Sequence, residues 1–568
     1  MKRKKKMSPS KKAIIAVLVV LTVFRAWLGL KTPMVFQPFA IHDDMLYANY
    51  SSQLLSGHYL GAFSTFTLLK TISPSVLLAF GFLFNISYPA FMTFGYIVAV
   101  GLLSFALYKL SRSKSLSIFT YILLLYSPIM FHEENVQLVY RGGYIIIFSL
   151  LVISAIVGMY AVARQQTFKS RSFYCWVALA TISLPNFYYM KEDSIWIMPF
   201  VLVGTAMTIF AMKKNKSLRR SSLFISVVPI ISLGVAGLLY RTVNLIAYGE
   251  FALVDRSGTN FSKVLNDLVT LDAEEEHPST VWVSNHMLET AASQSETMNE
   301  LMPFIKQSWK NWFRDEGAEA PGDFYIWALR DAVNLAGHYT SGKDVEEYYA
   351  KIHNELSDAY KSGKLKHATG KAYISPTMYG MTTGEFFDYF PQRFAVALNE
   401  VVTYNHNITE VKTDYEDFYG TTEMANLTLA EPTSSRQVYE RYSHGAVKID
   451  TGITKIYKLA GRIVFGLAIM GLLSSIITLI IRAKSHRLIY SEETATWLVA
   501  VGLFTTAIII LFAVVWFCNF LDDKKIYDYA SATIPCIQIF EAIFIWSLIS
   551  NLKQLYNRIK EKHERKNS

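Results

Sequence analysis

Apolar segments of membrane-spanning length dominate this sequence and restrict the folds open to it. A helix needs about 20 mostly apolar residues to cross a bilayer. By this measure we expect about ten membrane-spanning helices, near residues 13–31, 86–110, 115–131, 144–163, 173–190, 195–212, 221–240, 457–482, 495–519 and 531–550. A shorter apolar stretch at 74–84 is expected to lie in or dip into the membrane interface. The sequence therefore predicts an all-α polytopic membrane protein.

The composition supports a membrane location and excludes several kinds of site. Charged residues make up only 18% of the 568 residues, whereas soluble globular chains carry about 25%. The three cysteines, Cys175, Cys518 and Cys536, lie in or beside apolar segments without a CxxC pair, so neither a disulfide framework nor a zinc site is expected. The apolar run after the basic N-terminus is long and lacks a small-residue cleavage site, which favours an uncleaved membrane anchor.

The positive charges of the chain indicate its orientation in the membrane. The net charge of +10 is gathered in short clusters beside the apolar segments, and such clusters mark cytoplasmic loops. With ten spans all of the clusters fall on one side: Lys2 to Lys6, Lys109 to Lys114, Arg164 to Arg171, Lys213 to Arg220, Arg482 to Arg487 and Lys553 to Lys566. We therefore expect a multi-pass plasma-membrane protein with both termini in the cytoplasm. The basic start and the lack of disulfides favour a bacterial membrane.

A long polar segment divides the chain into three parts. Residues 1–240 are expected to form an N-terminal transmembrane module with catalytic outer loops, 241–455 an extracytoplasmic domain, and 456–568 the C-terminal transmembrane helices and a cytoplasmic tail. The middle part, at about 200 residues, is large enough to have its own core. It is predicted to be mainly helical, because the stretch 343–365 repeats apolar residues at helical spacing and stops at Gly363.

The first outer loop carries two adjacent carboxylates, Asp43 and Asp44, followed by an aromatic-rich segment at helical spacing that ends at Gly57. Charge beside the hydrocarbon of a membrane is costly and tends to be kept for function. One carboxylate is expected to act as a general base toward an acceptor hydroxyl. The other would orient it, bind the acceptor or hold a divalent cation. A solvated acidic turn is the alternative.

The second outer loop places Glu133 and Glu134 shortly before Arg141, which stands at the start of the next apolar segment. Arginine at this boundary can bind a lipid-linked phosphate through two parallel hydrogen bonds. The alternative is an arginine that extends toward water and only marks the helix end.

The third outer loop is a tight hairpin with Lys191, Glu192 and Asp193 between two apolar segments. Lys191 could neutralise a departing phosphate, while one of the two carboxylates orients sugar hydroxyls or a metal ion. A charged turn without a role in binding is the alternative. Because Asp43, Arg141 and Lys191 would all lie at one membrane face, we expect them to line a single cavity. The last outer loop, Asp522 to Lys525, is expected to be a solvated turn.

The first 110 residues carry a recognisable combination of motifs: an acidic pair after the first span, an aromatic-rich helix ending in Leu-x-x-Gly, and Lys-x-x-x-Pro before an interfacial helix. This combination resembles the multispanning glycosyltransferases of the GT-C fold. The matching residues are Asp43, Asp44, Tyr47, Leu54, Gly57, Tyr59, Lys70 and Pro74. The resemblance implies a GT-C-like, inverting glycosyltransferase that takes a sugar from a polyprenyl-phosphate carrier, with a first-loop aspartate as catalytic base.

Together these features predict transfer of a sugar from a polyprenyl-phosphate donor to a cell-envelope glycan or a lipid-linked acceptor at the outer face. The expected site residues are Asp43 and Asp44 for catalysis, Arg141, Lys191 and Lys70 for the donor phosphate, and Glu133, Glu134, Glu192 and Asp193 for the acceptor or a metal ion. A divalent cation such as Mg²⁺ or Mn²⁺ fits such oxygen ligands; no other cofactor and no nucleic-acid partner is expected.

A polytopic transporter or flippase for a lipid-linked saccharide is the competing interpretation. Transporters tend to place ionisable groups at the bilayer midplane and often contain two similar halves. The predicted spans are expected to lack central carboxylates, which favours the enzyme. The inner loops are also too short for a domain that binds a soluble nucleotide sugar, so a lipid-linked donor is expected.

Overall fold

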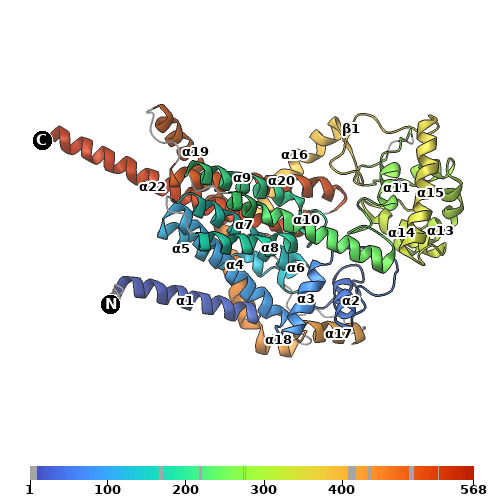
Figure 1. Ribbon diagram of the computed structural model, residues 1–568, viewed down its shortest axis with the longest axis horizontal. Coiled ribbons are helices and arrows are strands. Elements are labelled where there is room, and N and C mark those ends of the chain that lie inside the picture. Colours follow the sequence, from blue (N-terminus) through green and yellow to red (C-terminus); the bar gives the residue numbers. More distant parts are fainter. Residues whose placement is uncertain are drawn as a thin grey trace.

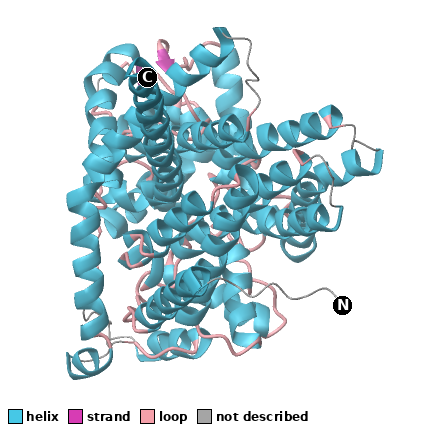
Figure 2. Cartoon of the chain, turned by 90° about the vertical axis from the view of Figure 1, so that its left-hand side faces the viewer, coloured by secondary structure: helices cyan, strands magenta, loops and turns pink. Residues whose placement is uncertain are grey.

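The computed structural model describes residues 9–165, 170–215, 220–272, 274–275, 277–406, 408, 418–432, 436–484, 491–521 and 523–567. Within them the chain is almost entirely helical, with very little strand (Figure 2). The predicted all-α polytopic architecture is confirmed. The basic cluster Lys2 to Lys6 and the acidic residue Asp522 lie outside the described residues.

Two groups of helices, before and after the outer domain, form the membrane bundle (Figure 1). The first group comprises α1 (Pro9–Leu30), α2 (Asp44–Leu55), α3 (Ser73–Leu83), α4 (Tyr88–Ser111), α5 (Lys114–Leu125), η1 (Pro128–Met130), α6 (Glu133–Val136), α7 (Gly142–Ala163), α8 (Ser170–Tyr188), η2 (Ser194–Ile197), α9 (Met198–Lys214) and α10 (Arg220–Tyr248). The second comprises α19 (His444–Lys484), α20 (Glu492–Phe517), η3 (Cys518–Phe520), α21 (Asp523–Ala530), η4 (Ser531–Thr533) and α22 (Ile534–Asn567). Helix α7 is the centre of the bundle and packs against α4, α8 and α9.

Eight helices among the described residues are long and apolar enough to cross a membrane, which corrects the expected count of about ten. They cover Lys11–Leu30, Tyr88–Ser111, Gly142–Ala163, Ser194–Lys214, Ser221–Tyr248, His444–Lys484, Glu492–Phe520 and Lys525–Glu561. The predicted span 115–131 is instead the 12-residue α5 followed by η1. The predicted span 173–190 falls in α8, which packs against α7 and α10 but has polar residues at both ends and Pro185 in its interior.

Helix α5 ends early because Pro128 lacks the backbone N–H and the conformational freedom that a continuing helix needs. The carbonyls on either side of this break lie inside the bundle, where unsatisfied backbone groups are costly. Side chains of three other helices donate to them: Arg25 Nε to Leu125 O (3.0 Å), Arg25 Nη2 to Met130 O (3.2 Å), the Tyr96 hydroxyl to Leu124 O (2.5 Å) and the Tyr457 hydroxyl to Leu123 O (2.7 Å). These bonds tie α1, α4 and α19 to the broken helix.

The helices of the outer domain between residues 260 and 361 lie at the end of the bundle opposite both chain termini (Figure 1). As predicted, the domain is mainly helical. Its elements are α11 (Asn260–Val269), α12 (Asn285–Ala292), α13 (Glu296–Phe313), α14 (Phe324–Leu335), α15 (Gly342–Lys361), β1 (Lys371–Ala372), β2 (Met381–Thr382), α16 (Thr383–Val402), α17 (Phe418–Thr428) and α18 (Arg436–Tyr442). The two strands are antiparallel. Helix α15 covers the stretch with predicted helical spacing, and Gly363 follows it with a φ of +75°.

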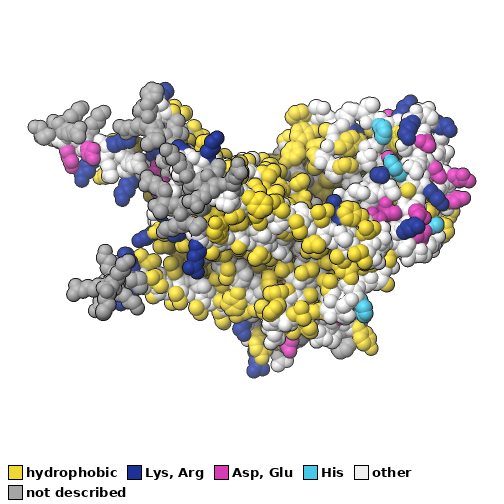
Figure 3. All heavy atoms as spheres, viewed as in Figure 1, with side chains coloured by type: hydrophobic (Ala, Val, Ile, Leu, Met, Phe, Trp, Pro, Cys, Tyr) yellow, Lys and Arg dark blue, Asp and Glu magenta, His cyan; other side chains and the backbone are white. Residues whose placement is uncertain are grey.

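The boundaries of the predicted outer domain differ from the observed ones. Helix α10 continues to Tyr248, beyond the predicted start of the domain at residue 241. Helix α19 already begins at His444, before the predicted end of the domain at residue 455. Helix α17 packs against α2 and α3, and α18 packs against α19. The surface of the bundle between its charged ends is covered with hydrophobic side chains (Figure 3), as expected for helices that face lipid.

Replacing Arg25 by methionine tests the role of the capped helix break. Arg25→Met removes two hydrogen bonds and leaves buried carbonyls unpaired, so we expect the free energy of unfolding to fall by about 2–4 kcal/mol. Thermal unfolding of the purified protein in detergent measures the change. The matched control is Arg462→Met, because Arg462 also lies on an apolar helix but, within the part of the chain that the structure describes, its side chain bonds to Asn399 alone and at an exposed position; its effect should stay below about 0.5 kcal/mol. Equal effects of the two substitutions would contradict a structural role for Arg25.

Candidate functional site

The two carboxylates of the first loop stand at the start of α2 in very different surroundings. Asp43 is the N-cap residue, and its side chain keeps 52% of its surface accessible. Asp44 begins the helix and is only 2% exposed. The difference arises because α2 packs the face that carries Asp44, Tyr47 and Ser51 against the protein. The helix ends before Gly57, which has a φ of +78° that suits glycine.

Lys70 reaches the first loop from a strained segment of chain. Tyr59 and Leu68 have φ values of 54° and 57°, a region that side-chain-bearing residues rarely adopt. This strain persists because Arg330 of the outer domain holds the segment, donating to the carbonyls of Thr65 (2.6 Å) and Thr67 (3.1 Å). The buried Lys70 ammonium then forms an ion pair with Asp43.

Tyr140 and Arg141 bring the second loop to the same place. The Tyr140 hydroxyl lies 3.2 Å from Asp43 Oδ1 and 3.3 Å from Lys70 Nζ. Arg141 Nη1 donates to Glu192 of the third loop at 2.9 Å. Tyr140 was not among the predicted site residues; its place beside Arg141 in the Tyr-Arg-Gly-Gly sequence is the only signal that could have indicated it.

Two glycines allow the second loop to fold back onto α7. A Cβ atom on Gly142 would lie 2.3 Å from Asn135 Oδ1, and one on Gly143 would lie 2.1 Å from Asn135 O. Both approaches are far shorter than any contact a real side chain makes, so only glycine fits. The loop that carries Glu134 is therefore pressed against the start of α7, beside Arg141.

The three predicted loops meet at one cavity with a volume of about 360 Å³. As expected from the sequence, Asp43, Arg141 and Lys191 all line it. The wall also contains apolar side chains of the bundle helices, among them Ile145 of α7 and Ile510 of α20. Charged groups from outer loops and apolar groups from membrane helices therefore share a single opening.

The predicted site residues divide into three groups. Asp43, Asp44, Glu134, Arg141, Lys191 and Asp193 line the cavity. Lys70 and Glu192 stand behind its wall, where each pairs with a lining residue, Asp43 and Arg141 respectively. Glu133 lies on α6 and does not line the cavity.

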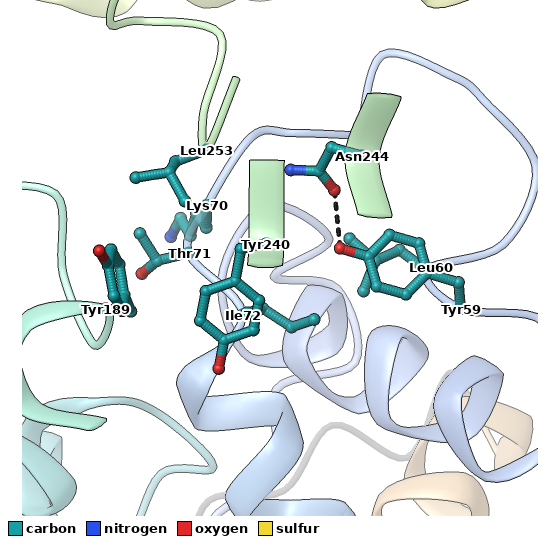
Figure 4. A pocket seen from close by; sticks show the side chains of 9 residues that line it. All are labelled: Tyr59, Leu60, Lys70, Thr71, Ile72, Tyr189, Tyr240, Asn244 and Leu253. Atoms are coloured by element: carbon teal, nitrogen blue, oxygen red, sulfur yellow. Dashed lines mark hydrogen bonds between the residues drawn. The ribbon is translucent and has the colours of Figure 1, made fainter. Parts of the chain in front are cut away.

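A second, very small cavity lies behind Lys70 (Figure 4). Its volume is about 10 Å³, which is room for about one water molecule. Tyr189 and Tyr240 line it, and the Tyr59 hydroxyl, also at its wall, donates to Asn244 Oδ1 at 2.7 Å. The cavity is too small to admit a sugar. The residues that line it support the loop that holds Lys70.

The last outer loop belongs to the site, which corrects the prediction of a solvated turn. Lys525, Asp528 and Tyr529 of α21 line the main cavity. Lys525 Nζ lies 3.2 Å from Asp528 Oδ2 and 3.4 Å from Glu134 Oε1 of the second loop. The signal in the sequence was their spacing, since residues three and four positions apart share one face of a helix.

The outer domain forms part of the cavity wall and is bonded to the segment that follows α20. Phe324, at the start of α14, lines the wall. Trp282 Nε1 donates to Asn519 Oδ1 (2.9 Å), and Arg393 Nη2 donates to the carbonyl of Leu521 (2.5 Å), which also lines the cavity. No local sequence motif marks either contact, so the position of the domain over the site is not predictable from the sequence.

The electrostatic surroundings shift the pKa values of the two aspartates in opposite directions. Burial alone would raise the pKa of Asp43, but Lys70, together with Arg141 and Tyr140, lowers it below its ordinary value. For Asp44, burial and then the charges of Asp43 and Glu134 raise the pKa well above the ordinary value. Asp43 is thus the accessible carboxylate, and Asp44 is a buried acid.

The carboxylates of the site do not form a metal-binding set. Among the described residues, no group of three or more His, Cys, Asp or Glu side chains is arranged to hold a metal ion. The accessible carboxylates already have cationic partners: Asp43 with Lys70, Glu192 with Arg141 and Asp193 with Lys191 (2.7 Å). Arg141 also holds the pKa of Glu192 at about 2 against the opposing effect of burial. These residues do not fit the expected Mg²⁺ or Mn²⁺.

Asp44→Asn should remove a pH-dependent part of the stability. Because the pKa of Asp44 is higher in the folded than in the unfolded protein, its contribution is complete below the unfolded value of about 4 and is lost as the pH rises through the folded value. We expect the melting temperature of the variant to decline less with rising pH than that of the wild type. Asp358→Asn, at an exposed pair with Lys361, serves as control and should keep the wild-type profile. A wild-type profile in Asp44→Asn would contradict this assignment.

Comparison of the chain with protein-family models, with curated proteins and with solved structures finds no match. The resemblance of the first 110 residues to GT-C glycosyltransferases therefore stays a prediction from the sequence motif. The function has to be inferred from the chemistry of the cavity.

Proposed function

We propose that this protein is a membrane glycosyltransferase that moves a sugar from a polyprenyl-phosphate donor to a cell-envelope glycan or lipid-linked acceptor at the outer face. The observation that carries the proposal is the composition of the cavity wall. An accessible carboxylate, Asp43, faces the same 360 Å³ space as the cations Arg141, Lys191 and Lys525 and the apolar side chains of the bundle.

Asp43 suits the role of general base. It is the accessible member of the pair, and its lowered pKa keeps it ionised near neutral pH. It would accept the proton of an acceptor hydroxyl as that oxygen attacks the anomeric carbon of the donor. Tyr140 and Lys70 bond to the same carboxylate and fix its orientation.

The cations are placed to stabilise the negative charge that develops on a departing phosphate. Breaking the bond between sugar and carrier leaves negative charge on phosphate oxygens, so fixed positive groups beside them stabilise the transition state more than the ground state. Arg141 offers a planar, bidentate guanidinium, while Lys191 and Lys525 offer point charges from two other loops. The donor therefore needs no separate general acid.

The apolar part of the wall suits the lipid portion of the donor. Ile145, Trp196 and Ile510 belong to segments long and apolar enough to cross a membrane. A carrier whose chain lies in the bilayer could bring its phosphate to the cavity along these helices without leaving apolar surroundings.

Transport of a lipid-linked saccharide is the second candidate, because the expectation that the spans lack central carboxylates fails at one position. Glu541, midway along the predicted span 531–550, is buried in α22 with 1% exposure, and Asp450 near the start of α19 is buried too. Ionisable groups inside a membrane bundle often serve transport. Enzyme and transporter differ in whether the saccharide changes its covalent partner.

Asp43→Asn tests the catalytic base. The amide keeps the size of the side chain but cannot accept the proton, so we expect the rate of sugar transfer to fall about 10²- to 10⁴-fold. Transfer from a synthetic polyprenyl-phosphate sugar to a lipid-linked acceptor in detergent micelles measures it. Asp358→Asn is the control for expression and folding. Near-wild-type transfer by Asp43→Asn would remove Asp43 as base, and loss of saccharide translocation without any transfer would favour the transporter.

Arg141→Ala tests the phosphate contact. We expect kcat/KM for the donor to fall about ten- to a hundredfold, since hydrogen bonds to a charged group contribute about 1.5–3 kcal/mol, with a smaller change for the acceptor. The substitution also leaves Glu192 without its partner. The double variant Arg141→Ala/Glu192→Gln separates the two effects, because it removes the unpaired charge. Equal losses for donor and acceptor in the double variant would refute the proposed contact.

A further inference from the structure

Glu541 lies inside the membrane bundle without a bonding partner. It is 1% exposed on α22, and neither carboxyl oxygen has a hydrogen-bond or ion-pair partner among the described residues. An ionised carboxylate left unpaired in apolar surroundings costs several kcal/mol. A bound proton removes this cost, because the neutral acid carries no charge to desolvate.

Polar groups surround Glu541 on two sides. Gln538, one turn earlier on α22, is fully buried, and its Nε2 donates to the Tyr404 hydroxyl at 3.1 Å while its Oε1 lacks a donor among the described residues. The Tyr404 ring packs edge-on against that of Tyr457 on α19 at 5.3 Å. Both tyrosines are within electrostatic range of Glu541.

The backbone that carries Tyr404 is strained. Tyr404 follows α16 with a φ of 52°, although it is a bulky, buried residue. Such a conformation is unfavourable and persists only where the surroundings impose it. Here it coincides with the hydrogen bond between Tyr404 and Gln538, which directs the hydroxyl into the bundle.

Two imidazoles, His132 and His406, lie next to each other on the side of the outer cavity. Asp528 lines the cavity, and its Oδ1 lies 2.9 Å from His132 Nε2. The ring of His132 is 5.8 Å from that of His406, a separation that one water molecule can bridge. Both ring nitrogens of His406 are buried without a hydrogen-bond partner among the described residues. Tyr404 stands two residues before His406 in the chain.

We propose that Glu541 is a proton-binding site inside the bundle, and that it exchanges its proton with the outer cavity through Tyr404, His406, His132 and Asp528. The proton is the ligand: it leaves water in the cavity, passes along these groups and ends on a Glu541 carboxyl oxygen. The site is independent of the proposed sugar transfer.

The groups that face this site are consistent with a neutral acid. Tyr457 from α19 and Tyr404 from the end of α16 are uncharged near neutral pH, and Tyr527 of α21 packs edge-on against His132 at 4.9 Å. On the α1 and α19 side, the charged groups Arg25 and Asp450 interact electrostatically with each other. Burial and the charge of His132 lower the pKa of His406 to about 3, so this imidazole is neutral and can both donate and accept a proton.

Infrared spectroscopy of the whole protein in lipid nanodiscs tests the site. A protonated carboxyl has a carbonyl band that shifts when its proton is replaced by deuterium. We expect one such band to be lost in Glu541→Gln, which keeps the size of the side chain, and to shift when the wild type is transferred to D₂O. In His406→Phe the shift should be at least tenfold slower. His338→Phe is the matched control, because His338 lies in the outer domain stacked on Tyr348, and it should exchange at the wild-type rate.

Three results would overturn the proposal. An unchanged spectrum in Glu541→Gln would mean that the carboxyl carries no proton. A wild-type band that never shifts in D₂O would mean that the site is closed to the cavity, and this result does not depend on the folding of any variant. Equal exchange rates in His406→Phe and His338→Phe would exclude the path through the imidazoles.

Discussion

Charge pairing between loops is the constraint on which the site depends. Four outer loops approach the membrane boundary. Lys70 and Asp43 join two parts of the first loop, Arg141 and Glu192 join the second loop to the third, and Lys525 and Glu134 join the last loop to the second. Removing a largely buried cation, Lys70 or Arg141, would leave a carboxylate of the site without its partner. Each loop therefore holds its neighbour in place, and the cavity between them is a consequence of the pairing.

The same ion pairs determine how a charged substrate can bind in the cavity. In the proposed reaction a donor phosphate competes with Glu192 for Arg141 and with Asp193 for Lys191, so binding exchanges one anionic partner for another instead of neutralising a free cation. Lys70 stays behind the wall of the cavity, where it lowers the pKa of Asp43. Donor binding would then rearrange the pairs of Arg141 and Lys191 while the pair that orients the base is kept.

The sequence predicted features that depend on neighbouring residues and missed those that depend on distant ones. Apolar length and charge clusters identified most spans, and the spacing in 343–365 identified α15. The shared cavity was predictable from the order of the loops. Phe324 and Asp528 were missed because their neighbours in space lie far away in sequence. Glu541 was missed for another reason: a single carboxylate hardly lowers the mean hydropathy of a long apolar segment.

The break after α5 links the outer cavity to the interior of the bundle. Because Pro128 ends the helix early, the carbonyls at the end of α5 and in η1 lie at a depth where Arg25, Tyr96 and Tyr457 donate to them. His132 follows the break, is buried, and bonds to Asp528 at the cavity, while its ring lies 5.8 Å from that of His406, which follows α16. Arg141, nine residues later, reaches Glu192 at the cavity. The early end of α5 thus precedes a loop that lies both beside the outer cavity and beside the buried imidazole of His406.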